Sequence, residues 1–323
     1  MLKYLKIIRW PNLLMVPFTM YLIRYCVIQP MLNYQFSFEL GTEVCFQLSN
    51  TYFLILVLIN MLLGAAGYII NDYFDRRIDN INRPETVIVD KVIPRRIAIL
   101  YHIILDVAAL VLAAIFAWHL RMMSILLLYV MIAGIFWLYS TTYKKQLIIG
   151  NLVVACGTAT IPLQVGIFDF VTLTREYGYE MMIKDLSFMP IVYWVAGFAF
   201  FAFLTNLIRE IVKDMEDIEG DGNYGCNTLP LVYGIKVSKI VVVGISIATI
   251  AALLTVYFCF LREPLSLTYI MLFIVIPFLL VIFLVIRAKE LRQYRRVSTI
   301  IKIIMLFGVL YSVLARQIME FVV

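Results

Sequence analysis

Nine stretches of this 323-residue chain are long and apolar enough to cross a membrane as helices, each of which needs about 20 apolar residues. They lie near residues 12–29, 51–70, 97–118, 123–143, 147–168, 188–208, 238–260, 266–286 and 299–319. Backbone polar groups in lipid must be paired within the segment, and the alternation of a membrane barrel is absent. We predict an all-α, polytopic integral membrane bundle of nine transmembrane helices around a central cavity.

The composition excludes a soluble globular domain. Hydrophobic residues make up 63% of the chain and charged residues 15%, whereas soluble domains average about 45–50% apolar and about 25% charged residues. No arginine-rich arm or aromatic platform suggests a nucleic-acid partner. The five cysteines show no paired spacing, which argues against a disulfide framework or a zinc site. No obligate protein partner is evident.

The basic residues predict how the chain sits in the membrane. With a cytoplasmic N-terminus, all but six of the 27 Lys and Arg residues fall in predicted cytoplasmic stretches; the six are Arg24, Arg121, Arg175, Lys184, Arg262 and Arg316. This bias sets the orientation of membrane proteins. The first residues lack a small-residue cleavage site, so they are expected to form an uncleaved anchor. We predict an integral protein of the cytoplasmic (inner) membrane, with its N-terminus inside.

Two acidic runs interrupt the apolar pattern, NDYFDRRID at residues 71–79 and KDMEDIEGD at residues 213–221. Each follows a long apolar segment, and both fall on the predicted cytoplasmic side. No linker separates the two parts, so we expect one domain, 1–323. The repeated placement suggests two pseudo-repeated halves, about 1–145 and 146–323, with Asp75 matched to Asp217.

Both runs have helical spacing. In the first, Asn71, Asp75 and Asp79 fall at i, i+4 and i+8, and Asp72 shares their face. In the second, the acidic residues fall at i, i+4, i+7 and i+11, which predicts a second stripe on one helix; these are Glu210, Asp214, Asp217 and Asp221. Such carboxylates repel one another unless a cation is present.

The ligand types indicate which cation would fit. Oxygen donors without His or Cys suit Mg²⁺ or Ca²⁺ rather than zinc or iron. Mg²⁺ usually binds one or two carboxylates together with substrate phosphate oxygens. Solvated loops would be the ordinary alternative, but two matched clusters with accompanying basic residues favour Mg²⁺ ions that bridge the protein and a diphosphate.

The same residues resemble a known family. NDYFDRRIDNINRP is similar to the Asn-x-x-x-Asp-x-x-x-Asp motif of the UbiA superfamily of intramembrane polyprenyl transferases, including its Asn-Arg-Pro. Asp217 and Asp221 resemble its second motif, Asp-x-x-x-Asp. LYSTTYKKQLIIGN is similar to its Tyr/Lys element, and RWPN at residues 9–12 to its opening. The chain departs from many members after the first motif. Those members have a basic Pro-rich stretch that contains Pro-Ser-Gly, whereas this chain has RPETVIVDKVIPRR.

The resemblance implies Mg²⁺-dependent transfer of a polyprenyl group from its diphosphate to a lipophilic acceptor in the membrane. An allylic diphosphate leaves when its developing negative charge is neutralised. The implied catalytic residues are Asp75, Asp79, Asp217 and Asp221. The implied metal ligands are these four together with Asn71, Asp72 and Asp214. The candidate diphosphate contacts are Arg9, Asn12, Arg83, Lys91, Tyr139, Lys144, Arg209 and Lys213.

The substrates stay open at this point. The sequence of the second run is similar to that of family members that prenylate a glycerol-phosphate lipid, as a geranylgeranylglycerol-phosphate geranylgeranyltransferase does. An aromatic quinone precursor (hydroxybenzoate, naphthoate or homogentisate type) is the alternative acceptor, and donor length cannot be read. An ion-coupled transporter is the rival of another class, although its acidic sites usually lie near the bilayer midplane.

Overall fold

The computed structural model describes residues 6–85 and 87–321. Within them no strand forms, and nine helical spans are long and apolar enough to cross a membrane. The spans are Trp10–Leu40, Asn50–Asn82, Arg95–His119, Ser124–Thr141, Ile149–Ile183, Met189–Glu216, Gly234–Leu261, Pro264–Arg287 and Leu291–Glu320. The prediction of an all-α integral membrane protein with nine spans is confirmed.

The first span joins several helical pieces: α2 (Trp10–Leu13), α3 (Met15–Leu22), the π-helices η1 (Ile23–Ile28) and η2 (Met31–Phe36), and α4 (Ser37–Leu40). Single helices form the next five: α5 (Asn50–Asn82), α6 (Arg95–His119), α7 (Ser124–Thr141), α8 (Ile149–Ile183) and α9 (Met189–Glu216). The last three are α12 (Gly234–Val256) with η4 (Tyr257–Leu261), α13 (Pro264–Ile270) with η5 (Met271–Val275) and α14 (Ile276–Arg287), and α15 (Leu291–Phe321). Three short helices lie between spans: η3 (Tyr143–Lys145), α10 (Ile218–Asn223) and α11 (Leu229–Val232).

Several helices are longer than the apolar stretches predict. The first span reaches Leu40 and α8 reaches Ile183, so most of residues 30–50 and 168–189, which lie between predicted spans, is helical. The predicted boundaries were wrong there because hydropathy marks the part of a helix that suits lipid. Backbone hydrogen bonding continues into residues that are polar enough to leave the lipid.

The helices divide between two compact units. Unit 1 holds the described residues up to Phe18, Ser49–Val153 and Asp217–Thr228; unit 2 holds Thr19–Leu48, Val154–Glu216 and the chain from Leu229 onward. The division interleaves distant parts of the sequence. The short stretch that contains Asp217 and Asp221 joins the unit that is formed mainly by α5, α6 and α7.

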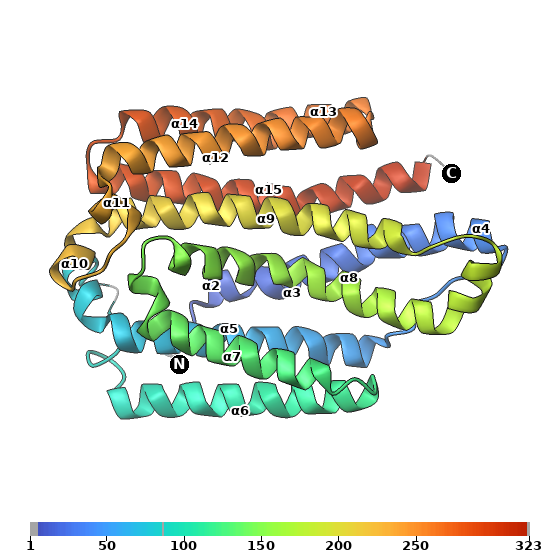
Figure 1. The fold of residues 1–323 in the computed structure, drawn as a ribbon, viewed down its shortest axis with the longest axis horizontal. Helices are drawn as coiled ribbons and strands as arrows, with labels where there is room; N and C mark the ends of the chain where they lie inside the picture. Colours follow the sequence, from blue (N-terminus) through green and yellow to red (C-terminus); the bar gives the residue numbers. More distant parts are fainter. Residues whose placement is uncertain (1–5, 86, 322–323) are drawn as a thin grey trace. The chain divides into compact units, whose positions relative to one another are not determined.

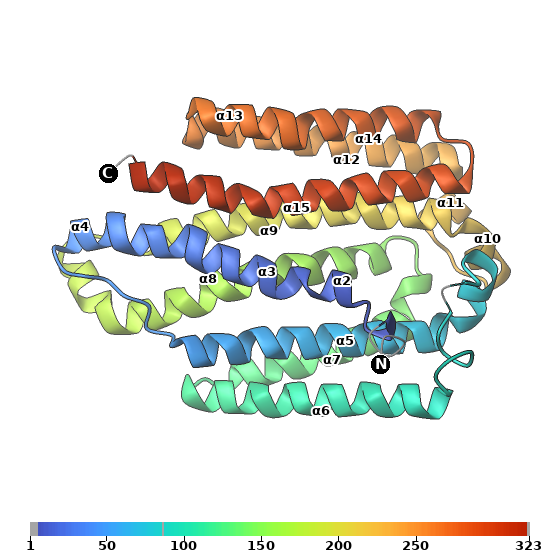
Figure 2. The same cartoon turned by 180° about the vertical axis from the view of Figure 1, so that it is seen from behind.

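Unit 1 is a layered packing of α5, α6 and α7, which run side by side (Figure 1). The short helix α2 lies against α5 (Figure 2). Gly64 and Gly67 of α5 allow these close approaches, because a Cβ would lie 3.1 Å from the Leu13 side chain and 3.2 Å from the Phe136 ring, respectively. Glycine therefore sets the spacing of the helices that surround the first acidic run.

Helix α6 buries small residues and exposes large apolar ones, which is the reverse of the pattern in a soluble helix. Its buried face carries small residues, Ala109, Ala113 and Ala117, each 0% exposed. Its opposite face presents large apolar side chains; these are Ile103, Val107, Val111 and Ile115. Small residues let helices approach closely, whereas large apolar side chains suit lipid. The pattern supports a membrane-embedded helix rather than a soluble amphipathic one.

In unit 2, α9, α12, α14 and α15 pack side by side (Figure 1). A buried ion pair joins η1 to α8: Arg24 Nε lies 3.4 Å from Asp169 Oδ2, and the two side chains are 0% and 1% exposed. Arg24 also donates to the Leu48 carbonyl and lies over the Phe46 ring. These contacts fix the segment that links the first span to α5.

Candidate active site

The first acidic run lies where α5 changes from apolar to polar. Helix α5 continues through the run to Asn82, so the predicted i, i+4, i+8 face exists, and Asp75 is buried on it with 4% exposure. Asn71 precedes Asp75 by one helical turn. Its Oδ1 atom is buried and accepts no hydrogen bond. The run therefore combines a buried carboxylate with an unused oxygen acceptor.

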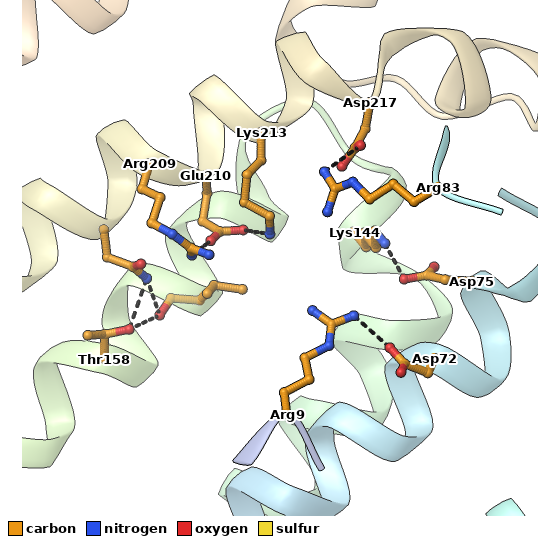
Figure 3. A network of polar contacts seen from close by, with 12 residues as sticks. Arg9, Asp72, Asp75, Arg83, Lys144, Thr158, Arg209, Glu210, Lys213 and Asp217 are labelled. Carbon is orange, nitrogen blue, oxygen red and sulfur yellow. Dashed lines mark hydrogen bonds and ion pairs between the residues drawn. The ribbon is translucent and has the colours of Figure 1, made fainter. Parts of the chain in front are cut away.

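Three cations of unit 1 lie beside three of the predicted metal-binding carboxylates (Figure 3). Arg9 Nη2 is 2.6 Å from Asp72 Oδ1, Lys144 Nζ contacts Asp75 Oδ2, and Arg83 Nη2 is 2.7 Å from Asp217 Oδ1. Positive charge from three separate parts of the chain thus converges on the aspartates. Such cations can neutralise the carboxylates or an added diphosphate.

Arg9 is held in an unusual backbone conformation. It precedes α2 with φ 48° and ψ 49°, in the left-handed region that non-glycine residues seldom adopt. Burial alone would lower the pKa of its guanidinium, but the charge and hydrogen bond of Asp72 raise it, with a smaller contribution from Tyr68. Its side chain also lies over the Tyr68 ring, 5.5 Å from the centroid. Arg9 is therefore a fixed, permanently charged group.

Lys144 lies in η3, directly after α7. Gly150 permits this tight turn, since a Cβ there would lie 2.9 Å from both Lys144 Cα and the Tyr143 carbonyl oxygen. Burial would lower the pKa of Lys144, but Asp75, and then Tyr139 and Asp79, raise it well above the usual value. The lysine stays protonated, and three predicted site residues act on its ammonium group.

The second acidic run is not one continuous helix. Helix α9 ends at Glu216, Asp217 has φ −93° and ψ 9°, and α10 begins at Ile218. The predicted stripe at i, i+4, i+7 and i+11 was therefore wrong. The break divides the run: Asp217 and Asp221 belong to unit 1, with the first run, whereas Asp214 belongs to unit 2.

Hydrogen bonds attach the second run to α5 and η3. The Asn82 amide donates to the Asp217 carbonyl at 3.1 Å and accepts from the Gly220 N–H at 2.8 Å. The Asn227 N–H donates to the Lys145 carbonyl at 2.8 Å. Asn82 lies within the first motif, but its role could not be predicted from the sequence, because its partners are backbone groups 135 and 138 positions away.

The pKa of the Cys226 thiol is shifted by groups from both acidic runs. Burial, and next the charge of Asp221, raise the pKa of its thiol to about 11. Lys144 and Lys145 oppose this shift, and Asp75 adds to it. The thiol of Cys226 is therefore influenced by carboxylates from both acidic runs and by two lysines of η3.

Four further predicted diphosphate contacts form hydrogen bonds with groups other than the aspartates of unit 1; these are Arg209, Lys213, Lys91 and Asn12. Arg209 and Lys213 belong to unit 2, where both pair with the buried Glu210 carboxylate, at 2.6 and 2.8 Å. Lys91 is exposed and donates to the Pro84 carbonyl at 2.7 Å. Asn12 lies in α2, close to Arg9, and its N–H donates to the Arg9 carbonyl.

The donor set fits Mg²⁺ that is shared with a diphosphate. Among the described residues no three His, Cys, Asp or Glu side chains gather around one point, so the protein alone would not complete a metal shell. Mg²⁺ commonly takes one or two carboxylates and fills its remaining positions with phosphate oxygens and water. The unused Asn71 Oδ1 and the carboxylates of Asp75, Asp79, Asp217 and Asp221 suit that arrangement.

Comparison with known proteins decides the family, because residues 41–313 match the UbiA prenyltransferase family. The chain belongs to that family. Among its relatives, the digeranylgeranylglyceryl phosphate synthase of Thermococcus kodakarensis is 33% identical over 266 residues, or 81% of this chain and 84% of the relative. The protein of the same name from Thermococcus sibiricus is 37% identical over 203 residues, which is 62% of each chain. That alignment covers less than two thirds of the relative.

Solved structures of UbiA proteins share the fold. One, of digeranylgeranylglyceryl phosphate synthase in membranes, has a TM-score of 0.61 and 24% identity, covering 97% of both chains. A UbiA homologue from Archaeoglobus fulgidus, bound to DMAPP and Mg²⁺, has a TM-score of 0.53 and 17% identity, covering 96% of this chain and 99% of that one. The sequence-based recognition of the family is confirmed.

Proposed function

We propose that this UbiA protein transfers a geranylgeranyl group from its diphosphate to geranylgeranylglyceryl phosphate, with Mg²⁺ as cofactor. The observation that carries the proposal is the grouping of the first aspartate run, and of Asp217 and Asp221 from the second, with Arg9, Arg83 and Lys144 in one unit. Carboxylates that face cations, with an unused amide oxygen beside them, suit a ligand of high negative charge that arrives with Mg²⁺.

The same residues suggest how the donor would be activated. Asp75, Asp79, Asp217 and Asp221 would hold Mg²⁺, with Asn71 and Asp72 beside them, and bound Mg²⁺ would neutralise negative charge on the diphosphate. Lys144, Arg9 and Arg83 would exchange part of their carboxylate contacts for diphosphate oxygens. Because the pKa of Lys144 is raised, that lysine would remain a charged donor throughout.

Prenyl transfer then needs one bond to form and one to break. The bond between C1 of the prenyl chain and the diphosphate oxygen breaks, and the electron pair leaves with the diphosphate. C1 bonds to the acceptor hydroxyl oxygen, whose proton passes to the released diphosphate or to water. Charge development on the leaving diphosphate is what fixed cations stabilise most, by about 10²–10³-fold in rate for each well-placed donor.

The relatives support the choice of acceptor. Proteins named digeranylgeranylglyceryl phosphate synthase match this chain at 33% identity over 81% of its length and at 32% over 76%, the second from Methanosphaera stadtmanae. An aromatic quinone precursor is the alternative. For orientation we propose that the N-terminus and the site face the cytoplasm, which the bias of Lys and Arg supports.

Diphosphate release by the purified protein tests the proposal. The assay combines geranylgeranyl diphosphate and Mg²⁺ with either geranylgeranylglyceryl phosphate or an aromatic acid, and mass spectrometry identifies the product. We expect metal-dependent release and an ether product with the glycerol-phosphate lipid alone. A prenylated aromatic product would replace the proposed acceptor. Absence of donor binding would overturn the prenyl-transfer proposal and favour the transporter.

A further inference from the structure

Asn82, the last residue of α5, forms two hydrogen bonds with the turn that begins the second acidic run. Its amide nitrogen donates to the Asp217 carbonyl at 3.1 Å, and its amide oxygen accepts from the Gly220 N–H at 2.8 Å. Only one orientation of the amide satisfies both partners, because a carbonyl only accepts and an N–H only donates.

These contacts replace an ordinary helix cap. Asp217 is the N-cap residue of α10, and an N-cap aspartate usually accepts from the second or third N–H of its own helix. Here the Asp217 side chain makes no such bond. The third N–H, that of Gly220, is taken by Asn82 instead. The Asp217 carboxylate turns to Arg83, with Oδ1 at 2.7 Å from Nη2.

Gly220 is needed for this arrangement. A Cβ at residue 220 would lie 2.4–2.6 Å from the Nδ2, Oδ1 and Cγ atoms of Asn82, so any larger residue would displace the amide. The hydrogen bond between Asn82 and Gly220 therefore depends on both residues, although they are 138 positions apart.

We propose that Asn82 is a positioning residue: by capping α10 from α5, it leaves the Asp217 carboxylate for the metal–diphosphate site and fixes the second aspartate run relative to the first. This inference rests on the proposed function. Asp79 lies less than one helical turn before Asn82 on α5, so the same helix end would set the separation between aspartates of the two runs.

The test compares Asn82→Ala with Asn80→Ala, an exposed asparagine two residues earlier on the same helix. Binding of Mn²⁺ in the presence of inorganic diphosphate is followed by electron paramagnetic resonance, so the readout does not depend on turnover. Loss of a residue that orients metal ligands typically costs about 10–100-fold in affinity. We expect the Mn²⁺ dissociation constant to rise at least about tenfold for Asn82→Ala and to stay unchanged for Asn80→Ala.

Turnover provides a second readout, in which high Mg²⁺ should restore most of the activity of Asn82→Ala. An unchanged thermal unfolding midpoint of metal-free Asn82→Ala would exclude a role confined to stability, because bound metal also stabilises a weakened fold. Gly220→Ala should reproduce the defect, and the double variant should be no worse than Asn82→Ala, because the added methyl then has room. Unchanged Mn²⁺ affinity in Asn82→Ala, absence of rescue, or additive losses would overturn the inference. Failure of the wild-type protein to bind Mn²⁺ and diphosphate would instead overturn the proposed function, and this inference with it.

Discussion

Neighbouring lysines in η3 have different surroundings. Lys144 contacts Asp75, and its pKa is raised, despite burial, by Asp75, Tyr139 and Asp79. The side chain of Lys145 is exposed, and the backbone carbonyl of Lys145 accepts a hydrogen bond from the Asn227 N–H. Two residues of one type, adjacent in sequence, should therefore contribute very differently to function.

Replacing each lysine by alanine tests this difference. Lys144→Ala should lower kcat/KM for the prenyl donor about 100-fold, because it removes a fixed cation beside the leaving diphosphate. Lys145→Ala keeps the backbone carbonyl and should stay within about twofold, as an exposed charge contributes little. The measurement is diphosphate release at varied donor concentration. Equal losses in the two variants would contradict the assignment.

The raised pKa of Lys144 also predicts a pH profile. A raised pKa means that the charged form is present below the ordinary lysine value and is lost only as pH rises through the higher one. Activity should therefore show no descending limb from Lys144 between pH 7 and about pH 10. The check is kcat/KM against pH for wild type and Lys144→Arg. A limb near pH 8–9 that disappears in Lys144→Arg would exclude a permanently charged lysine.

At the scale of elements, local pattern determined some features and tertiary contacts determined others. Apolar length was enough to predict nine spans, and helical spacing predicted the Asn71–Asp79 face of α5. The break at Asp217 was not predictable, because no proline interrupts the run and the helix ends where Asn82 bonds to the chain from α5. The pairing of Asp217 with Arg83 follows from that distant contact.

The connection between α5 and α6 is fixed by its apolar residues. Val89 and Ile93 are each 1% exposed, and they form a core cluster with Ile7, Ile69 and Ala98. A bridge joins residues 89 and 93. Val89 and Ile93 therefore anchor residues 87–94 of this connection by packing.

Loss of that anchor should lower stability. Ile93→Ala should lower the free energy of unfolding by about 3 kcal/mol, because truncating a buried isoleucine leaves a cavity. Ile97→Ala, a change of the same type at a residue with 38% exposure, should cost well under half as much. The shift of the thermal unfolding midpoint in detergent measures both. Similar shifts would show that the connection does not depend on this cluster.

At the scale of the whole molecule, the sequence is divided between two compact units in an interleaved way. Within unit 2 the Arg24–Asp169 pair is almost completely buried, at 0% and 1% exposure. Removing one member of a buried pair leaves an uncompensated charge, whereas replacing both with apolar residues can be neutral. The pair therefore predicts a specific pattern of stability.

Asp169→Ala should destabilise the protein by about 3 kcal/mol or more, and the double variant Arg24→Met with Asp169→Leu should recover most of that loss. Glu180→Ala, at an exposed residue of the same helix, is the matched control and should have little effect. Thermal unfolding in detergent measures all of them. A double variant as unstable as Asp169→Ala would argue against charge burial as the cause.

We propose that Asp75 of the first run and Asp217 of the second contribute to one metal–diphosphate site. The most direct test is calorimetric binding of a non-cleavable geranylgeranyl diphosphate analogue, with and without Mg²⁺, to wild type, Asp75→Asn and Asp217→Asn, with the exposed Glu219→Gln of α10 as control. We predict Mg²⁺-dependent binding that either aspartate substitution weakens at least about tenfold and the control leaves intact. Binding that depends on Asp75 but is indifferent to Asp217 would contradict a shared site.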